Sequence, residues 1–405
     1  MSDSLRPVLR ALDLFPIESE GQKLLCLRDP EGYSSHLVFL QPAAVFMIAR
    51  MDGQNTLQDI ADAFQKASGR PVALTQLEGL VADLDQQYLL DSPRFREYKA
   101  AAEEAFRTAT VRPMAHGGRA YEGEPDKLRT MLNGWMDAAS SNRNGQLRAL
   151  IAPHIDYHRG GPCYGHAYQA LRGTDFETVV VLGTSHAPTR RFFAGTLKDF
   201  ETPLGLLEND RPFMEELMRR YRLPMTDDEL VHKNEHAIEL QTTFIKHLLP
   251  QARIVPILVG SFHPMLVAGM SPWDMAAVRD FVQAMRETVS ALGRRVCYIA
   301  AADLAHIGTR FGDEEPADDK LMAWVAAEDA LSLAEAAAVR PEGWFGKSAA
   351  EGDRRRICGL SPIYTMLRVL APDAIAGKLL QYQQCNEPTG ANNVTIASVA
   401  YYEKA

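Results

Sequence analysis

The chain has 405 residues, 46% of them hydrophobic and 23% charged, which is a globular composition and more than one core usually spans. The formal net charge of −9 argues against nucleic acid as the main partner, since phosphate binding needs a dominant cationic face. No apolar run reaches about 18 residues, so we expect no membrane span. Five scattered cysteines without a CxxC pair and no apolar leader segment favour a cytoplasmic protein with reduced thiols.

Residues 1–92 are predicted to form one small domain. Short apolar runs over 21–28 and 35–40 indicate strands, and the stretch 43–49 indicates a helix. The Asp-Gly pair that follows is predicted to end this helix at Gly53, since glycine favours the left-handed C-terminal position.

Two more helices are expected before the first domain ends. Thr56 is placed to cap the first of them, and the second carries its leucines between Leu77 and Leu89. Three helices beside a small sheet describe a winged helix, and the stretch 50–64 resembles PqqD-like domains, which bind precursor peptides. The last helix carries carboxylates and no Lys or Arg, so DNA readout is disfavoured. Residues 93–111 are predicted to be a helical connector.

From residue 112 to 405 the pattern changes to apolar runs that alternate with helical stretches. Nearly continuous apolar runs suit strands that are covered on both faces. The prediction is a three-layer α/β domain, with helical segments such as 212–221 and 276–292 between the strands. The clearest predicted strands are residues 149–152, 179–183, 254–260 and 296–301.

Polar residues follow these strands, at the sheet edge where open α/β sheets usually bind ligands. His154, His186 and His306 each come just after a strand, and a fourth polar segment, 232–241, can start a helix. Neutral imidazoles together with a carboxylate are the usual ligands of divalent iron, zinc or copper. Three further residues of these segments are expected to line the same site: Asp156, Ser185 and Asn234.

Six ordered motifs carry a resemblance to the Memo family, which includes AmmeMemoRadiSam system protein B. The resemblance starts near His116 and ends near Tyr401, over about 290 residues. It implies the fold of the class III extradiol ring-cleaving dioxygenases, in which two histidines and a carboxylate hold a non-haem iron. The motifs are AlaProHisIleAspTyr, LeuGlyThrSerHis, AsnGluHisAlaIleGluLeuGln, IleValProIleLeuValGly, AlaAspLeuAlaHis and IleCysGlyLeuSerPro.

Carried over by position, His154 and His186 match the metal-binding histidines of the family. His236 matches the position of a catalytic acid/base histidine. The human member of the family has a cysteine where this chain has Ala305, and Asn234 replaces an expected aspartate. Because alanine cannot bind a metal, the third protein ligand must be another residue or be absent. Three candidates remain open: Asp303, His306 and Glu239.

The resemblance implies a dioxygenase-like, metal-dependent oxidoreductase that acts on a small molecule or a modified peptide. Iron is the expected metal, with copper and zinc as alternatives. The rival hypothesis is a non-catalytic scaffold that binds a peptide or protein within a radical-SAM-associated system, together with radical-SAM and AMMECR-type proteins. Cys358 is expected to be a buried structural thiol. Ser185 lacks the flanking glycines of a nucleophile elbow, so a serine hydrolase is disfavoured.

Overall fold

The computed structural model divides into two compact units, Met1–Thr108 and Ala109–Ala405. The division falls inside the predicted connector, whose residues Pro93–Thr108 form helix α4 of the first unit. In the described part of the chain, no helix is both long and apolar enough to cross a membrane. The structure describes residues 5–19, 22–34, 36–140, 145–371, 373–387 and 390–404.

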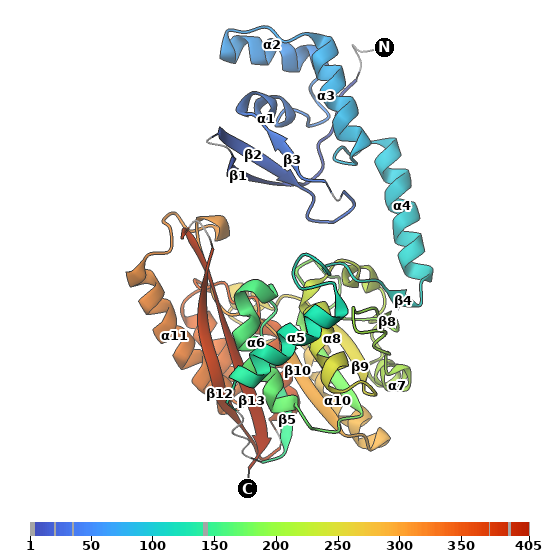
Figure 1. Cartoon of the computed structure of the whole chain (residues 1–405), viewed down its shortest axis with the longest axis vertical. Coiled ribbons are helices and arrows are strands. Elements are labelled where there is room, and N and C mark those ends of the chain that lie inside the picture. Colours follow the sequence, from blue (N-terminus) through green and yellow to red (C-terminus); the bar gives the residue numbers. More distant parts are fainter. Residues whose placement is uncertain are drawn as a thin grey trace. The chain divides into compact units, whose positions relative to one another are not determined.

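The first unit combines a three-stranded antiparallel sheet, in the order β1-β2-β3, with helices (Figure 1). β2 and β3 correspond to the two predicted strands, whose first residues, 21 and 35, lie outside the described residues. Strand β1 was not predicted, because its sequence contains Pro16, which an edge strand tolerates. The elements are β1 (Asp13–Ser19), β2 (Gln22–Arg28), β3 (Val38–Leu40), α1 (Pro42–Ile48), α2 (Leu57–Ser68) and α3 (Leu74–Gln86).

The helix ends of this unit test two predictions. Thr56 caps α2 as predicted, because its side chain accepts a hydrogen bond from the N–H of Asp59. Gly53 does take a positive φ of 81°, but α1 already ends at Ile48, so the prediction that Gly53 ends this helix is wrong. The winged-helix, PqqD-like assignment stays a prediction.

The second unit is built on an eight-stranded mixed sheet, with the strands in the order β11-β13-β5-β10-β6-β9-β7 and β12 paired to β13. Its centre is parallel, since β5, β10, β6 and β9 run in one direction. The strands are β5 (Leu147–Ala152), β6 (Thr178–Thr184), β7 (Phe193–Gly195), β9 (Arg253–Val259), β10 (Val296–Ala301), β11 (His306–Gly308), β12 (Ile375–Asn386) and β13 (Asn392–Glu403); β4 (Val111–Arg112) and β8 (Asp199–Phe200) form a separate pair.

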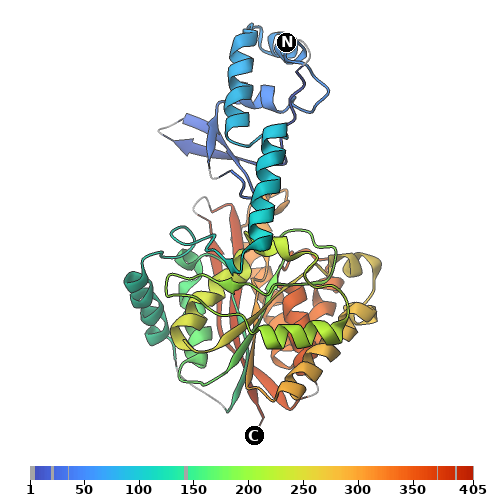
Figure 2. The ribbon, with the colours of Figure 1, turned by 90° about the vertical axis from the view of Figure 1, so that its right-hand side faces the viewer.

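Helices cover both faces of this sheet, which confirms the three-layer α/β fold (Figures 1 and 2). Neighbouring residues of β6 enter different cores: Val180 packs with α7, α10 and α13, whereas Val181 packs with α5, α6 and α8. The helices are α5 (Pro125–Ala138), α6 (Tyr157–Leu171), α7 (Arg211–Tyr221), α8 (His236–Leu248), α9 (His263–Ala268), α10 (Ala276–Leu292), α11 (Asp319–Ala337), α12 (Pro341–Ala350) and α13 (Leu360–Leu370).

The parallel strands present their carboxyl ends at one edge of the sheet. β5 leads to His154, β6 to His186 and β10 to Asp303, and helix α8 begins at His236. The register pairs Ala301 of β10 with Ala152 of β5 and with Gly183 of β6, so the three strand ends are level with one another. The residues that follow them therefore emerge side by side.

Candidate metal site

His154 lies in the loop after β5 and is almost fully buried. Its backbone N–H donates to Oδ1 of Asp303 at 2.7 Å, and its ring Nδ1 lies 3.0 Å from the carbonyl oxygen of Ala301. A carbonyl can only accept, so Nδ1 carries the proton and Nε2 keeps its lone pair. Burial lowers the pKa of His154 to about 3, so the imidazole is neutral at pH 7.

His186 follows β6 and is oriented by Glu235. The ring Nδ1 lies 2.9 Å from Oε1 of Glu235, and the backbone N–H of His186 donates to Oε2 at 2.9 Å. The same carboxylate caps α8, since Oε1 also accepts the backbone N–H of His236. Burial lowers the pKa of His186, but the charge and hydrogen bond of Glu235 outweigh it, and the pKa is raised overall.

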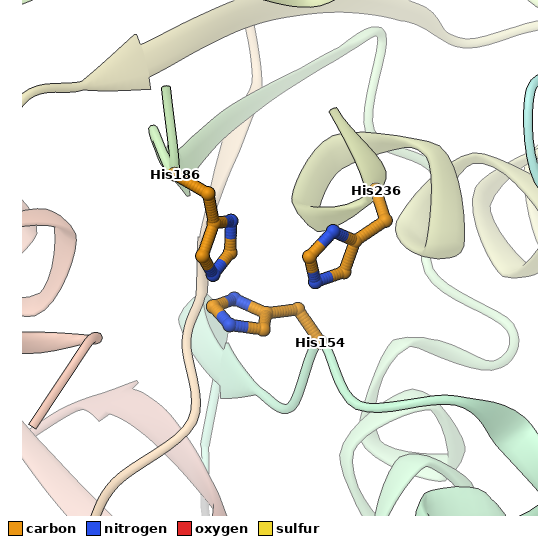
Figure 3. A group of neighbouring side chains, drawn as sticks. All are labelled: His154, His186 and His236. Atoms are coloured by element: carbon orange, nitrogen blue, oxygen red, sulfur yellow. The ribbon is translucent and has the colours of Figure 1, made fainter. Parts of the chain in front are cut away.

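His236 completes a cluster of three histidines, whose side chains converge on one space (Figure 3). One ring nitrogen from each of His154, His186 and His236 lies within 4.8 Å of the others. The rings of His186 and His236 stack with centroids 4.5 Å apart, and His154 meets both edge to face. Burial and the neighbouring histidines keep the pKa of His236 well below its ordinary value.

The cluster is buried on the side of His154 and open to solvent on the side of His186 and His236. The side chain of His154 is 2% exposed, whereas those of His186 and His236 are 40% and 34% exposed. A metal ion bound by the three nitrogens would therefore keep positions that face solvent. Open positions distinguish catalytic metal sites from structural ones.

Asp303 and His306, two of the candidates for a third ligand, lie next to the cluster. Oδ2 of Asp303 is 3.8 Å from Nε2 of His154, while its Oδ1 holds the backbone of His154 and Ile155. Burial raises the pKa of Asp303 to about 6. The ring Nδ1 of His306 lies 3.1 Å from the carbonyl oxygen of Leu304. Neither residue belongs to the set of three donors.

Glu239, the remaining candidate, has its carboxylate engaged elsewhere. It is fully buried, forms an ion pair with Arg112 and accepts a hydrogen bond from the hydroxyl of Tyr121 at 2.7 Å. The backbone N–H groups of Ala115 and His116 also donate to it. These contacts give Glu239 a structural role in anchoring the segment before α5.

The residues that were expected to line the site mainly form hydrogen bonds with backbone groups or surrounding side chains. Asp156 caps α6 and pairs with Arg159, and the hydroxyl of Ser185 donates to the carbonyl of Ala187. The carbonyl oxygen of Asn234 lies 2.8 Å from Nε2 of His116. Ala305 is buried in an apolar cluster with three neighbours: Ile307, Met322 and Val325.

Three residues that contact the cluster were not predicted for it. Sγ of Cys358 lies 3.2 Å from Nε2 of His154, and the ring of His116 lies 5.7 Å from that of His236. Glu235 caps α8 and also orients His186. The signal for Cys358 was its place in the IleCysGlyLeuSerPro motif, which the sequence alone could not locate in space. Burial, with Asp303 nearby, raises the thiol pKa of Cys358 well above its ordinary value.

Comparison with known proteins agrees with the resemblance seen in the motifs. A MEMO1 family protein of Aquifex aeolicus is 27% identical over 402 residues, which cover 98% of this chain and 100% of that protein. A second MEMO1 family protein, from Thermus thermophilus, is 28% identical over 65% of this chain and 74% of its own length. The memo-1 homolog of Caenorhabditis elegans is 27% identical over 68% and 78%. The family model for Memo-like proteins matches residues 112–403, and the chain therefore belongs to the Memo-like protein family.

Proposed function

We propose that the three-histidine cluster is the site of a divalent metal, iron in the first place, with His154 and His186 as ligands and His236 as either the proton-transfer residue or the third ligand. The protein would then be a metal-dependent, dioxygenase-like oxidoreductase. The substrate class is a small molecule or a modified peptide. The observation that carries the proposal is the convergence of three imidazole nitrogens within 4.8 Å at an edge that is open to solvent. Such a donor set can hold iron, copper or zinc.

The hydrogen bonds around the cluster fit a metal site. Metal-bound histidines usually donate their other ring N–H to a carboxylate or a backbone carbonyl. His186 has Glu235 as that partner, and His154 has the carbonyl of Ala301. With Nδ1 engaged in this way, each ring presents the lone pair of Nε2, which in His154 also lies 3.2 Å from Sγ of Cys358 and would have to exchange this contact for a metal. Burial keeps His154 neutral, as a ligand must be.

The chemistry divides between the metal and the chain. A bound divalent iron would supply Lewis-acid and redox chemistry toward oxygen and a chelating substrate. The residues of the chain would supply the remaining functions. His154 and His186 would bind and orient the metal, and the burial of His154 would exclude water from that side of the site. His236, half-buried at the open side, is placed to move a proton to or from a bound substrate.

The first test is metal content. The protein is purified without oxygen, reconstituted with ferrous iron, and compared with His154→Ala and His186→Ala. His247→Ala is a matched control, because that ring pairs with Asn133 away from the cluster. About one metal ion per chain, lost in both cluster variants and kept in the control, supports the proposal. A protein that binds no iron, copper or zinc would overturn it.

Turnover needs a separate measurement. Oxygen uptake by the iron-loaded protein is followed with a panel of catechols, since vicinal diols chelate a metal through two oxygens. Uptake that requires both the metal and His186 supports the oxidoreductase. Stoichiometric metal without oxygen uptake on any diol would instead favour the binding scaffold.

A specific observation favours peptide binding by the first unit as a second candidate function. β3 is an edge strand; Phe39 within it is 56% exposed, and Leu37 just before it is 52% exposed. We propose that an extended peptide adds to β3 as a further strand, because an edge strand offers unpaired backbone groups. Peptides selected by phage display on the full chain should lose binding to Phe39→Asp. Selected peptides that bind this variant equally well would contradict the proposal.

A further inference from the structure

A second feature of the same sheet edge is a cavity of about 500 Å³ beside His186. We call it the arginine pocket, and its walls include Arg190, Arg191, Phe192, Tyr221, Leu223 and Pro264. His186 also lines it, and is the residue that the pocket shares with the three-histidine cluster. The volume suits a small organic molecule.

The two arginines give the pocket an uncompensated positive charge. No Asp or Glu is among the described residues that line the pocket, neither Arg190 nor Arg191 forms an ion pair with a described carboxylate, and both residues are exposed. Their backbones, in contrast, are fixed, since both N–H groups donate to Oδ2 of Asp228, at 2.8 and 3.0 Å. Asp228 therefore fixes the loop through backbone hydrogen bonds and forms no ion pair with either described guanidinium group, so both remain available to a ligand.

Tyr221 adds a polar group with no partner to this wall. Its ring packs edge to face against Phe193 and Phe281, and the residue is 3% exposed. Its buried hydroxyl has no hydrogen-bond partner among the described residues, which is uncommon for a buried polar atom. Burial and Asp280 raise the pKa of this hydroxyl, whereas Arg191, which lines the same pocket, lowers it.

We infer that the arginine pocket binds the anionic end of a small molecule with an apolar body, such as an aromatic carboxylate. The guanidinium groups of Arg190 and Arg191 match a carboxylate, because their N–H donors form paired, charge-assisted hydrogen bonds. Phe192, Leu223 and Pro264 offer apolar contact to the rest of the molecule. The further statement that this molecule is the substrate rests on the proposed metal function, since His186 borders both sites.

The test uses a ligand pair that differs only in charge. Benzoate and benzamide are titrated into the metal-free full chain and followed by NMR. The wild type should bind benzoate about tenfold or more tightly than benzamide, because a charge-assisted hydrogen bond is stronger than a neutral one. The Arg190→Gln/Arg191→Gln double variant keeps the backbone hydrogen bonds to Asp228. It should bind benzoate and benzamide about equally.

Arg129→Gln is the matched control, since Arg129 is a half-exposed arginine on α5 that does not line the pocket. Equal binding of benzoate and benzamide by the wild type would overturn the inference. So would a benzoate preference that survives in the double variant while its unfolding midpoint matches the wild type. The assay contains no metal, so a failure of the proposed metal function leaves this result unaffected.

Discussion

Glu235 accepts hydrogen bonds from both the backbone N–H and the ring Nδ1 of His186, at 2.9 Å each. The same carboxylate receives the first N–H groups of α8, which begins with His236. One buried side chain therefore sets the position of two histidines that come from different elements. His186 and His236 are expected to respond together when this carboxylate changes.

Replacing Glu235 by glutamine should weaken metal binding without unfolding the protein. The substitution removes the charge and one of the two acceptors, so the ring of His186 loses the partner that fixes its tautomer. Loss of such a supporting partner typically costs about 10–100-fold in metal affinity. Competition with a coloured chelator measures the affinity, and Glu287→Gln, an exposed glutamate on α10, is the control. An unchanged affinity would show that Glu235 acts only as a helix cap.

His236→Ala separates the two roles that are open to His236. If His236 transfers a proton, the variant should keep near-stoichiometric metal and lose about 10²–10⁴-fold in turnover, the usual contribution of a positioned acid or base. If His236 is instead the third ligand, as its nitrogen within 4.8 Å of the others allows, the metal content itself should fall. Metal analysis and oxygen uptake on the same preparation decide between these results.

The strands and the histidines that follow them could be predicted because apolar runs and their end points are local features of the sequence. All four strands predicted in the second domain form, and His154 and His186 emerge next to each other at their ends. β1 was missed because a proline in a short edge strand gives no clear local signal.

The partners of the site residues could not be predicted in the same way. Glu239 was one of the candidates for the third ligand, yet its carboxylate pairs with Arg112, 127 residues earlier in the chain. Cys358 lies 204 residues after His154 and contacts its ring. Contacts over such separations depend on how the chain folds back on itself, and no local pattern encodes them.

The ion pair of Arg112 and Glu239 predicts a pH-dependent stability. Replacing Arg112 by methionine leaves Glu239 as an unpaired buried charge, which should lower the free energy of unfolding by about 3–5 kcal/mol at neutral pH. Burial raises the pKa of Glu239, but Arg112 and the hydrogen bonds outweigh it, so the pKa lies below 4.5.

A carboxyl with a lowered pKa stabilises the fold above its ordinary pKa, and this contribution is lost as the pH falls through the folded-state value. The difference between wild type and Arg112→Met should therefore be largest at neutral pH and shrink as the pH falls toward the lowered folded-state pKa of Glu239. Urea unfolding across this range measures it, with Arg129→Met, which breaks an exposed pair, as the control. A difference that stays constant with pH would contradict the account.

Gly359 predicts a link between packing and the metal site. A Cβ at this position would lie 2.5 Å from both the Cβ of Ala302 and the carbonyl oxygen of Asp303, which is closer than real Cβ contacts come. Gly359→Ala should therefore displace the end of β10 or the neighbouring Cys358 and destabilise the protein by about 1–3 kcal/mol. Because Asp303 holds the backbone of His154, metal affinity should fall as well.

Gly134→Ala is the matched control for this substitution. Gly134 lies within α5 and a Cβ there meets nothing within 4 Å, so alanine should be neutral or stabilising by up to about 1 kcal/mol. Thermal unfolding and chelator competition on both variants test the pair. If Gly359→Ala keeps the stability and the metal affinity of the wild type, the close contact at β10 does not constrain the site, and the position of His154 must be set by its own hydrogen bonds alone.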